Sequence, residues 1–180
     1  ATTVVLRQAQ WEAMGAQSVY DVLELVPGLH VTEVGRSFRQ VVARGLFTSN
    51  NSQVLWLLDG KPLNELGAGG PPQAFDKGLA GLERIEVIRG PVSVIHGSNA
   101  FAAVINLVSQ AAGTPGSRVA VKGGSFDARA ALAETGGAQG DWRWRLSLEG
   151  RRSEGDPDRV IRRDIQDTFD ALFGSKVART

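Results

Sequence analysis

The sequence contains no cysteine among its 180 residues. Without cysteine the chain can form neither a disulfide framework nor a thiolate metal site. Histidine is scarce as well, with only His30 and His96, and no nucleophile-elbow, phosphate-loop, dinucleotide-binding or zinc-protease motif is present. Both histidines are therefore interpreted as loop or turn residues, and we expect no enzyme activity, no metal site and no cofactor.

Long runs of one kind of residue are also missing. The 20 basic and 19 acidic residues leave a net charge of +1 without a long run of either sign, so nucleic acid is not an expected partner. No apolar run approaches the ~18 residues of a membrane-spanning helix, which leaves soluble, peripheral and β-barrel proteins open. The first residues lack the pattern of a secretory signal, so we expect one to be absent or already removed.

Glycine is in excess, with 22 residues where an average chain of this length has about 13. So many glycines predict many turns, bulges or left-handed backbone positions. Up to about residue 115, short apolar runs alternate with glycine and proline, and charges fall at the edges of those runs. This half is predicted to be a compact α+β domain, with a small mixed sheet and short helices.

Local signals place several elements within this domain. Ser18 and Asp21 form a capping-box pattern before an apolar helical face, and Pro27–Gly28 is expected to end that helix. The run Val54–Leu58 is apolar throughout, which favours a strand covered on both faces, and Asp59–Gly60 supplies a tight turn after it. Further strands are expected at Ile85–Ile88 and Val104–Val108.

After the break at Gly113–Gly116 the pattern changes to a period of two residues, clearest in Trp142–Glu149. On a strand this period places apolar and polar side chains on opposite faces. Alternating strands of about ten residues are typical of a transmembrane barrel. An antiparallel sheet of a soluble domain has the same period, so both interpretations stay open on periodicity alone. The charged stretch 156–180 has apolar residues at helical spacing.

Four segments carry a resemblance to a known family. They are ERIEVIRGPVSVIHGSNAF from Glu83, DVLELVPGLHV from Asp21, VVARGLF from Val41 and VLWLLDGKPLN from Val54. In this order and spacing they resemble the plug domain of TonB-dependent outer-membrane receptors, and AAVINLVSQ from Ala102 looks like the last strand of that plug. The resemblance covers about residues 4 to 155. His96 departs from it, because the family usually has tyrosine there.

The resemblance implies a fold and a function. Residues 1–115 would be the plug, residues 116–155 the first antiparallel strands of a 22-stranded transmembrane barrel, and residues 156–180 an extracellular loop segment with a short helix, the barrel being truncated there. The whole would be an active transporter of the cell outer membrane that takes up a scarce ligand, a ferric siderophore or other metal chelate. The plug would lie inside the barrel lumen, accessible from the periplasm.

The implied partners are the ligand, outer-membrane lipid and TonB, which pulls on an upstream Ton box. No Ton box is evident in this chain, and Thr2–Leu6 is interpreted as the first strand of the plug itself. Ligand contacts in such plugs come from apical loops. The candidate residues in those loops are Glu33, Arg36, Ser37, Phe38, Ser49, Asn50, Asn51, Gln53, Leu66, Gly69 and Gly70.

Arg44 and Arg89 each precede a glycine at the end of an apolar run. Much of each side chain should therefore be buried, where a guanidinium needs an anionic partner. The resemblance implies a plug–barrel latch, in which these arginines pair with barrel glutamates. An ordinary pairing inside the plug, with Glu83 or Glu86, is the alternative.

On the alternating strand, the residues expected to face lipid are Trp142, Trp144, Leu146 and Leu148. Trp142, close to a turn, suits the aromatic girdle at the periplasmic interface. Arg143 and Arg145 would then face the lumen. The rival function is a free-standing periplasmic binding or interaction module with no barrel. A natural gene ending near Thr180 would favour that rival, since three strands cannot close a barrel.

Overall fold

The structure is a computed structural model. It describes residues 2–34, 38–46, 48, 50–71, 78–91, 93, 97, 99–125 and 127–153. The helix expected within 156–180 lies outside these residues. By contacts the chain divides into two compact units, residues 1–120 with 132–149, and residues 121–131 with 150–180.

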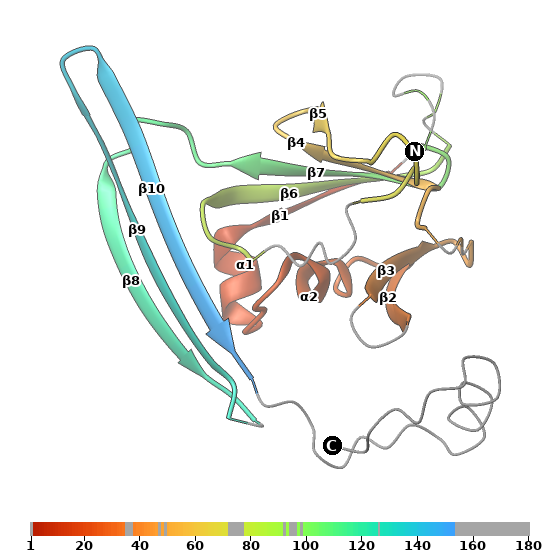
Figure 1. The fold of residues 1–180 in the computed structure, drawn as a ribbon, viewed down its shortest axis with the longest axis horizontal. Helices are drawn as coiled ribbons and strands as arrows, with labels where there is room; N and C mark the ends of the chain where they lie inside the picture. The colour runs from red at the N-terminus through yellow and green to blue at the C-terminus, as the bar shows by residue number, and fades with distance from the viewer. Residues whose placement is uncertain are drawn as a thin grey trace. The chain divides into compact units, whose positions relative to one another are not determined.

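A mixed five-stranded sheet forms the centre of the first unit (Figure 1). Its strand order is β1-β6-β7-β4-β5. β4 and β7 run parallel, whereas the other neighbouring strands pair antiparallel. The strands are β1 (Thr2–Arg7), β6 (Leu82–Arg89), β7 (Ala103–Ser109), β4 (Val54–Leu58) and β5 (Lys61–Pro62). The expected mixed sheet is confirmed, and the segment at Thr2 is its edge strand.

The position of β4 follows from its composition. Val54 to Leu57 are all buried, as expected for an apolar strand with neighbours on both sides and cover on both faces. The turn after β4 is also as predicted, because Asp59 and Gly60 have φ angles of 50° and 77°. Positive φ at both central residues is the geometry of a tight hairpin turn.

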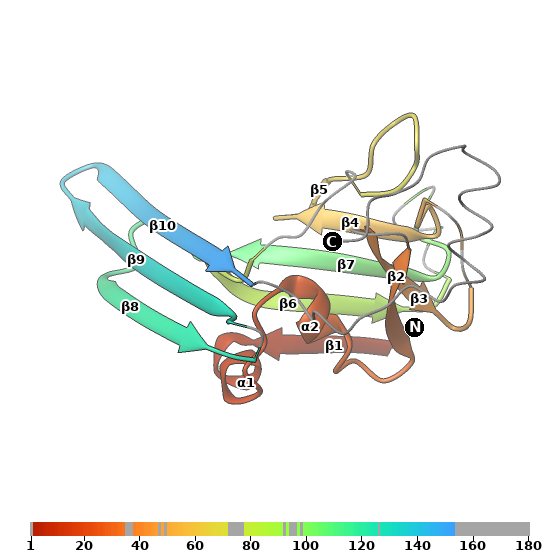
Figure 2. The ribbon, with the colours of Figure 1, turned by 60° about the horizontal axis from the view of Figure 1, so that its bottom comes forward.

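Two short helices cover one face of the sheet (Figure 2). They are α1 (Gln8–Ala13) and α2 (Val19–Leu23). The predicted capping box is confirmed, since the Asp21 backbone N–H donates to Ser18 Oγ at 3.3 Å and the Ser18 N–H donates to the Asp21 carboxylate at 2.9 Å. Within the described residues, no helix has the length and apolar character needed to cross a membrane.

The second helix ends earlier than Pro27–Gly28. After α2 the backbone makes three-residue turns, in which the N–H groups of Leu25 and Val26 donate to the carbonyls of Val22 and Leu23 at 3.2 and 3.0 Å. These tighter turns replace the last helical turn. Gly28, with φ of 82°, then turns the chain into the next strand.

The main core lies between the helices and the sheet. Its largest side chains include Trp11 and Trp56, 2% and 0% exposed. The rings of Tyr20 and Trp56 meet edge to face with centroids 5.6 Å apart, an arrangement favoured by aromatic quadrupoles. The other face of the sheet carries a smaller buried cluster, made by Leu55, Leu57, Ala100 and Val104.

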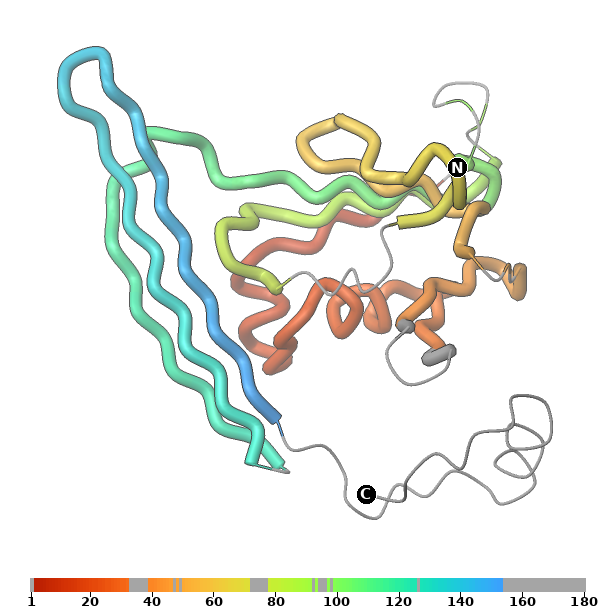
Figure 3. Tube along the Cα trace, viewed as in Figure 1, coloured from red at the N-terminus to blue at the C-terminus, as the bar shows by residue number. Residues whose placement is uncertain are grey.

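Two further sheets complete the fold. An antiparallel hairpin is formed by β2 (Leu29–Val34) and β3 (Phe38–Ala43). A three-stranded sheet in the order β10-β9-β8 follows β7, with its strands connected as successive hairpins (Figure 3). Its strands are β8 (Gly116–Gly123), β9 (Arg129–Gln139) and β10 (Trp142–Arg152). The predicted α+β fold followed by antiparallel strands is confirmed.

Candidate functional site

The three-stranded sheet exposes its apolar face. Trp142 is 81% exposed and Leu146 is 64% exposed, whereas the Arg145 side chain between them along β10 is only 14% exposed. On β8, Val119 is exposed while Arg118 is half-buried. A sheet of a soluble domain buries its apolar face and leaves the polar one in water. Here the polarity is reversed.

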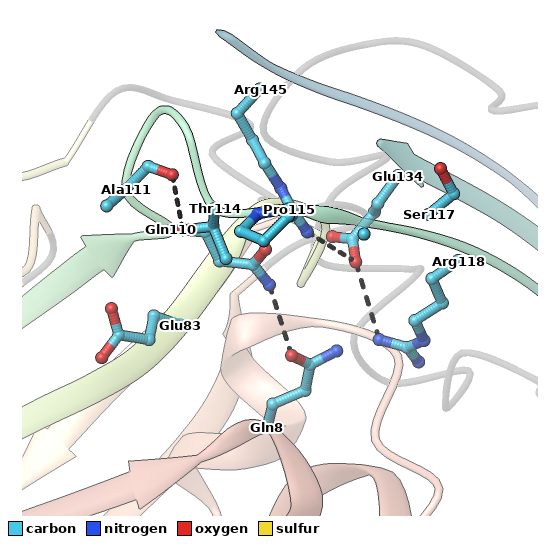
Figure 4. Close-up of a pocket in the computed structure, with 11 residues that line it drawn as sticks. Gln8, Glu83, Gln110, Ala111, Thr114, Pro115, Ser117, Arg118, Glu134 and Arg145 are labelled. Atoms are coloured by element: carbon cyan, nitrogen blue, oxygen red, sulfur yellow. Dashed lines mark hydrogen bonds and ion pairs between the residues drawn. The ribbon is translucent and has the colours of Figure 1, made fainter. Parts of the chain in front are cut away.

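The covered polar face is centred on Glu134 of β9, whose side chain is 2% exposed. Its Oε1 accepts a hydrogen bond from the Gly81 backbone N–H at 2.7 Å. Its Oε2 lies 3.7 Å from Arg118 Nη1 and 3.6 Å from Arg145 Nη2. Figure 4 shows the carboxylate between these two guanidinium groups. The arginines offset the charge of a carboxylate that would otherwise be costly to bury.

Two more contacts join this face to the first part of the chain. Arg118 Nη2 lies 2.5 Å from Oε1 of Glu12 on α1. The Ala80 backbone N–H donates to Glu149 Oε2 at 3.2 Å. The polar face of the three strands is therefore bound to the domain around the five-stranded sheet by charges and by backbone hydrogen bonds.

A cleft of about 390 Å³ opens beside Glu134. Its lining includes Gln8, Gln110, Arg118, Glu134 and Arg145 (Figure 4). Gln110 Nε2 donates to Gln8 Oε1 at 3.3 Å across the cleft. Among the described residues, no three His, Asp or Glu side chains gather in a way that could hold a metal ion.

The segments around residues 50 and 69 form one packed unit. The Asn64 amide donates to the carbonyls of Val54 at 2.9 Å and Gly69 at 2.8 Å. A Cβ on Gly70 would overlap the backbone carbonyl of Asn50. The position of each loop therefore depends on the other.

The candidate loop residues differ in exposure. Asn51 is 2% exposed and Gln53 is 7% exposed, whereas Leu66 is fully exposed. The Asn51 amide bonds both backbone groups of Val41, accepting from its N–H at 3.3 Å and donating to its carbonyl at 2.6 Å. Gln53 Nε2 donates to the Leu46 carbonyl at 3.2 Å. Asn51 and Gln53 thus hold the loop to its neighbours.

The other candidates in these loops fall into two groups. Asn50 is exposed, Gly69 is half-buried with φ of 74°, and Gly70 is buried. Arg36, Ser37 and Ser49 lie outside the described residues, as do the side chains of Glu33 and Phe38.

The sequence pattern of the TonB-dependent receptor plug domain matches residues 1–104, more than half of the chain. The chain belongs to this plug family. The family is one of receptors and not of enzymes.

A curated relative and solved structures agree with this assignment. The vitamin B12 transporter BtuB of Vibrio vulnificus (strain CMCP6) is 34% identical over 131 residues, which cover 72% of this chain and 21% of the transporter. The fold is similar to that of FpvA of P. aeruginosa bound to a heterologous ferric pyoverdine, with a TM-score of 0.71, 22% identity, and coverage of 84% of this chain and 20% of FpvA.

The ferric yersiniabactin uptake receptor FyuA of Yersinia pestis is also similar, with a TM-score of 0.66, 22% identity, and coverage of 84% of this chain and 24% of FyuA. At this identity the likeness concerns the fold. The chain spans about a fifth to a quarter of the length of these proteins.

The two candidate latch arginines of the plug lie in different surroundings. Arg89 is half-buried, and its Nη1 donates to the Pro27 carbonyl. Its Nε is buried with no hydrogen-bond partner among the described residues. Arg44 is exposed at φ of 57°. The expectation that much of Arg44 is buried was wrong, because this residue belongs to the turn after β3.

The alternative partners of Arg89 are engaged elsewhere. Arg84 Nε donates to Glu86 at 2.7 Å and its Nη1 donates to Glu83 at 2.9 Å. Hydrogen bonding from the Asn106 amide, with help from Arg84, holds the pKa of the Glu86 carboxyl below its ordinary value. The same two glutamates raise the pKa of Arg84.

Sequence reasoning missed the cluster around Glu134. It placed Arg145 on the polar face but gave no role to Arg118, Glu134 or Glu149. The available signal was the alternation itself, because these four charged residues share the polar face of the strands. Their contacts with Glu12 and Gly81 are separated by more than fifty residues along the chain, so no local pattern predicts them.

Proposed function

We propose that this chain is the gate of an outer-membrane active transporter that draws on TonB and admits a scarce metal chelate to the periplasm. Residues 1–115 are the plug, and residues 116–155 are the first strands of a 22-stranded barrel. The observation that carries the proposal is the reversed polarity of β8 to β10. An exposed apolar face behind a covered polar face suits strands with lipid on one side and a plug on the other.

The alternation supports a lipid-facing role for Trp142, Trp144, Leu146 and Leu148. These four residues are 47% to 81% exposed. A contiguous exposed apolar surface of this kind marks contact with a membrane or another partner. Arg145 and Ser147, which alternate with them along β10, are half-buried. The rival periplasmic module would have to leave this apolar face in water.

The proposed ligand contacts come from the apical loops. Asn50 and Leu66 are exposed there, while Asn51, Gln53 and Gly70 set the shape of the loops through their contacts with neighbouring backbone and side chains. Loops of this kind, held by a rigid scaffold, commonly carry binding residues. Among the large apolar side chains of the described residues, Leu66 has the highest fractional exposure.

Arg89 is also proposed to act as a latch toward the rest of the barrel. Its buried Nε without a hydrogen-bond partner supports this role, because such a group is stabilised by an acceptor. A barrel glutamate beyond the described residues would supply that acceptor. Arg44 is exposed in its turn, which leaves its guanidinium accessible for the same kind of pairing.

Uptake measurements test the proposed function. Cells that make the full-length receptor and cells deleted for it are compared for accumulation of ⁵⁷Co-cyanocobalamin and of ⁵⁵Fe-loaded siderophores, with and without a proton ionophore. Cobalamin is included because it is a metal chelate and a relative at 34% identity carries the name of its transporter. We expect the deletion to abolish ionophore-sensitive uptake of one chelate.

A variant pair sharpens this test. Leu66→Ala removes the exposed loop side chain, whereas Leu25→Ala removes an exposed leucine from the turn after α2. Only Leu66→Ala should raise the chelate concentration needed for half-maximal uptake. Equal accumulation of every chelate by deleted and parent cells would refute the proposed function.

A further inference from the structure

The turn before β6 is held by carboxylates of two of the following strands. The Gly81 N–H donates to Glu134 of β9 at 2.7 Å, and the Ala80 N–H donates to Glu149 of β10 at 3.2 Å. Hydrogen bonds to ionised carboxylates are stronger than those between neutral groups. Two adjacent backbone donors of the plug are thus bound by two acceptors on neighbouring strands.

Side chains at the two glycines of this turn would crowd side chains of β10. A Cβ on Gly78 would overlap the Glu149 carboxylate. A Cβ on Gly81 would lie 2.7 Å from Ser147 Oγ, and Gly81 also has a φ of +72°. The backbone conformation therefore favours glycine at Gly81, and a side chain there would also require Ser147 to shift.

The Glu134 carboxylate takes its hydrogen bond from the turn. Its two arginine partners lie at 3.6 and 3.7 Å, beyond hydrogen-bond distance, and its Oε2 has no hydrogen-bond partner among the described residues. The Gly81 N–H supplies the hydrogen bond at Oε1. A buried carboxylate left with distant charges alone would be poorly satisfied, so Glu134 and the turn depend on each other.

The same turn is bonded to the covalent connection between plug and strands. The Gln110 N–H donates to the Gly81 carbonyl at 2.8 Å, and Gln110 Nε2 donates to the Leu82 carbonyl at 3.4 Å. Gln110 directly follows β7, and β8 begins at Gly116. The turn before β6 is therefore bonded both to β9 and β10 and to the segment of chain that connects β7 with β8.

We propose that the turn Gly78–Gly81, hydrogen-bonded through Gly81 to Glu134 and through Ala80 to Glu149, forms a wall anchor that fixes the plug to the first barrel strands and keeps the pore sealed. The inference rests on the proposed function, in which these strands are barrel wall. It assigns a sealing role to two strand carboxylates and two glycines, separate from the latch arginines.

Entry of vancomycin, a large hydrophilic antibiotic, reports on the seal without requiring the natural ligand. Cells produce equal outer-membrane amounts of the full-length receptor or its variants. Gly81→Cys should make cells sensitive to several-fold lower vancomycin concentrations, because a side chain is strained at φ of +72° and its Cβ would lie 2.7 Å from Ser147 Oγ, so the turn or Ser147 must shift. Gly15→Cys is the matched control, since Gly15 has φ of +70° and nothing within 4 Å of its added Cβ.

A disulfide then tests whether restoring the contact restores the seal. A Cβ on Gly81 lies 3.4 Å from Ser147 Cβ, close to the ~3.5–4.5 Å range of disulfides. Cells with the double variant Gly81→Cys and Ser147→Cys should resist vancomycin when the disulfide is formed and become sensitive when it is reduced. Failure of the disulfide to form, or equal entry in both redox states, would overturn the wall anchor.

A receptor lacking residues 2–109 separates the two proposals. If it admits vancomycin and Gly81→Cys does not, the wall anchor is wrong while the gate function stands. If the plug-less receptor also excludes vancomycin, there is no pore to seal, and the proposed function fails together with the anchor.

Discussion

Replacement of Asn51 should destabilise the plug through its backbone contacts. Its buried amide makes hydrogen bonds to both the N–H and the carbonyl of Val41 on β3. Each such bond contributes about 1 kcal/mol, and leaving a buried backbone group unpaired costs about 1–3 kcal/mol. We expect Asn51→Ala to lower the free energy of unfolding by about 2–4 kcal/mol.

Two variants separate the amide from the backbone effect. Asn51 has φ of 55°, a conformation that costs a non-glycine residue about 1 kcal/mol or more. Asn51→Gly loses the amide without that cost, so it should be about 1 kcal/mol more stable than Asn51→Ala. Asn51→Asp retains an acceptor for the Val41 N–H but loses the donor to its carbonyl.

Urea unfolding of the chain, followed by near-ultraviolet circular dichroism, measures these differences. Hydrogen exchange of the Val41 amide gives a local readout, because its acceptor is the Asn51 side chain. Loss of less than about 0.5 kcal/mol in Asn51→Ala, the range of ordinary surface substitutions, would refute the reasoning.

Two further predictions concern local hydrogen bonds. Ser18→Ala removes the side-chain cap of α2 and should cost about 1 kcal/mol of unfolding free energy; an unchanged urea midpoint would contradict the capping role. The pKa of Asp59 is lowered chiefly by the Ser109 backbone N–H and then by its hydroxyl. Stability from Asp59 is therefore present above the ordinary aspartate pKa and is lost as the pH falls through the lowered pKa. The stability advantage of the parent over Asp59→Ala should shrink between about pH 5 and pH 2, and a constant difference there would argue against this linkage.

The sequence predicted elements whose signals are local. The capping box at Ser18, the buried strand Val54–Leu58 and the turn at Asp59 each depend on neighbouring residues, and each is present in the structure. The end of α2 was placed too late, because a Pro–Gly pair bounds a helix without excluding tighter turns before it. Alternation in β10 predicted which residues share a face.

Contacts between distant segments could not be predicted in the same way. Asn51 was assigned to a ligand-contact loop through the family resemblance, and its bonds to Val41 become visible only when β3 is in place. Glu134 is charged and so would ordinarily be taken as solvated. Its burial depends on Arg118, Arg145 and a turn fifty-three residues earlier in the chain.

Fluorescence quenching in membranes tests most directly whether the apolar face of β10 lies against acyl chains. The full-length receptor is placed in bilayers of lipids brominated along their acyl chains, and the Trp144 signal is obtained as the difference between the parent and Trp144→Phe. A fluorophore on Arg143→Cys probes the opposite face. If β10 is barrel wall, the lipid should quench Trp144 and leave the probe at position 143 bright. Quenching at position 143 with an unquenched Trp144 would contradict the assignment of these strands.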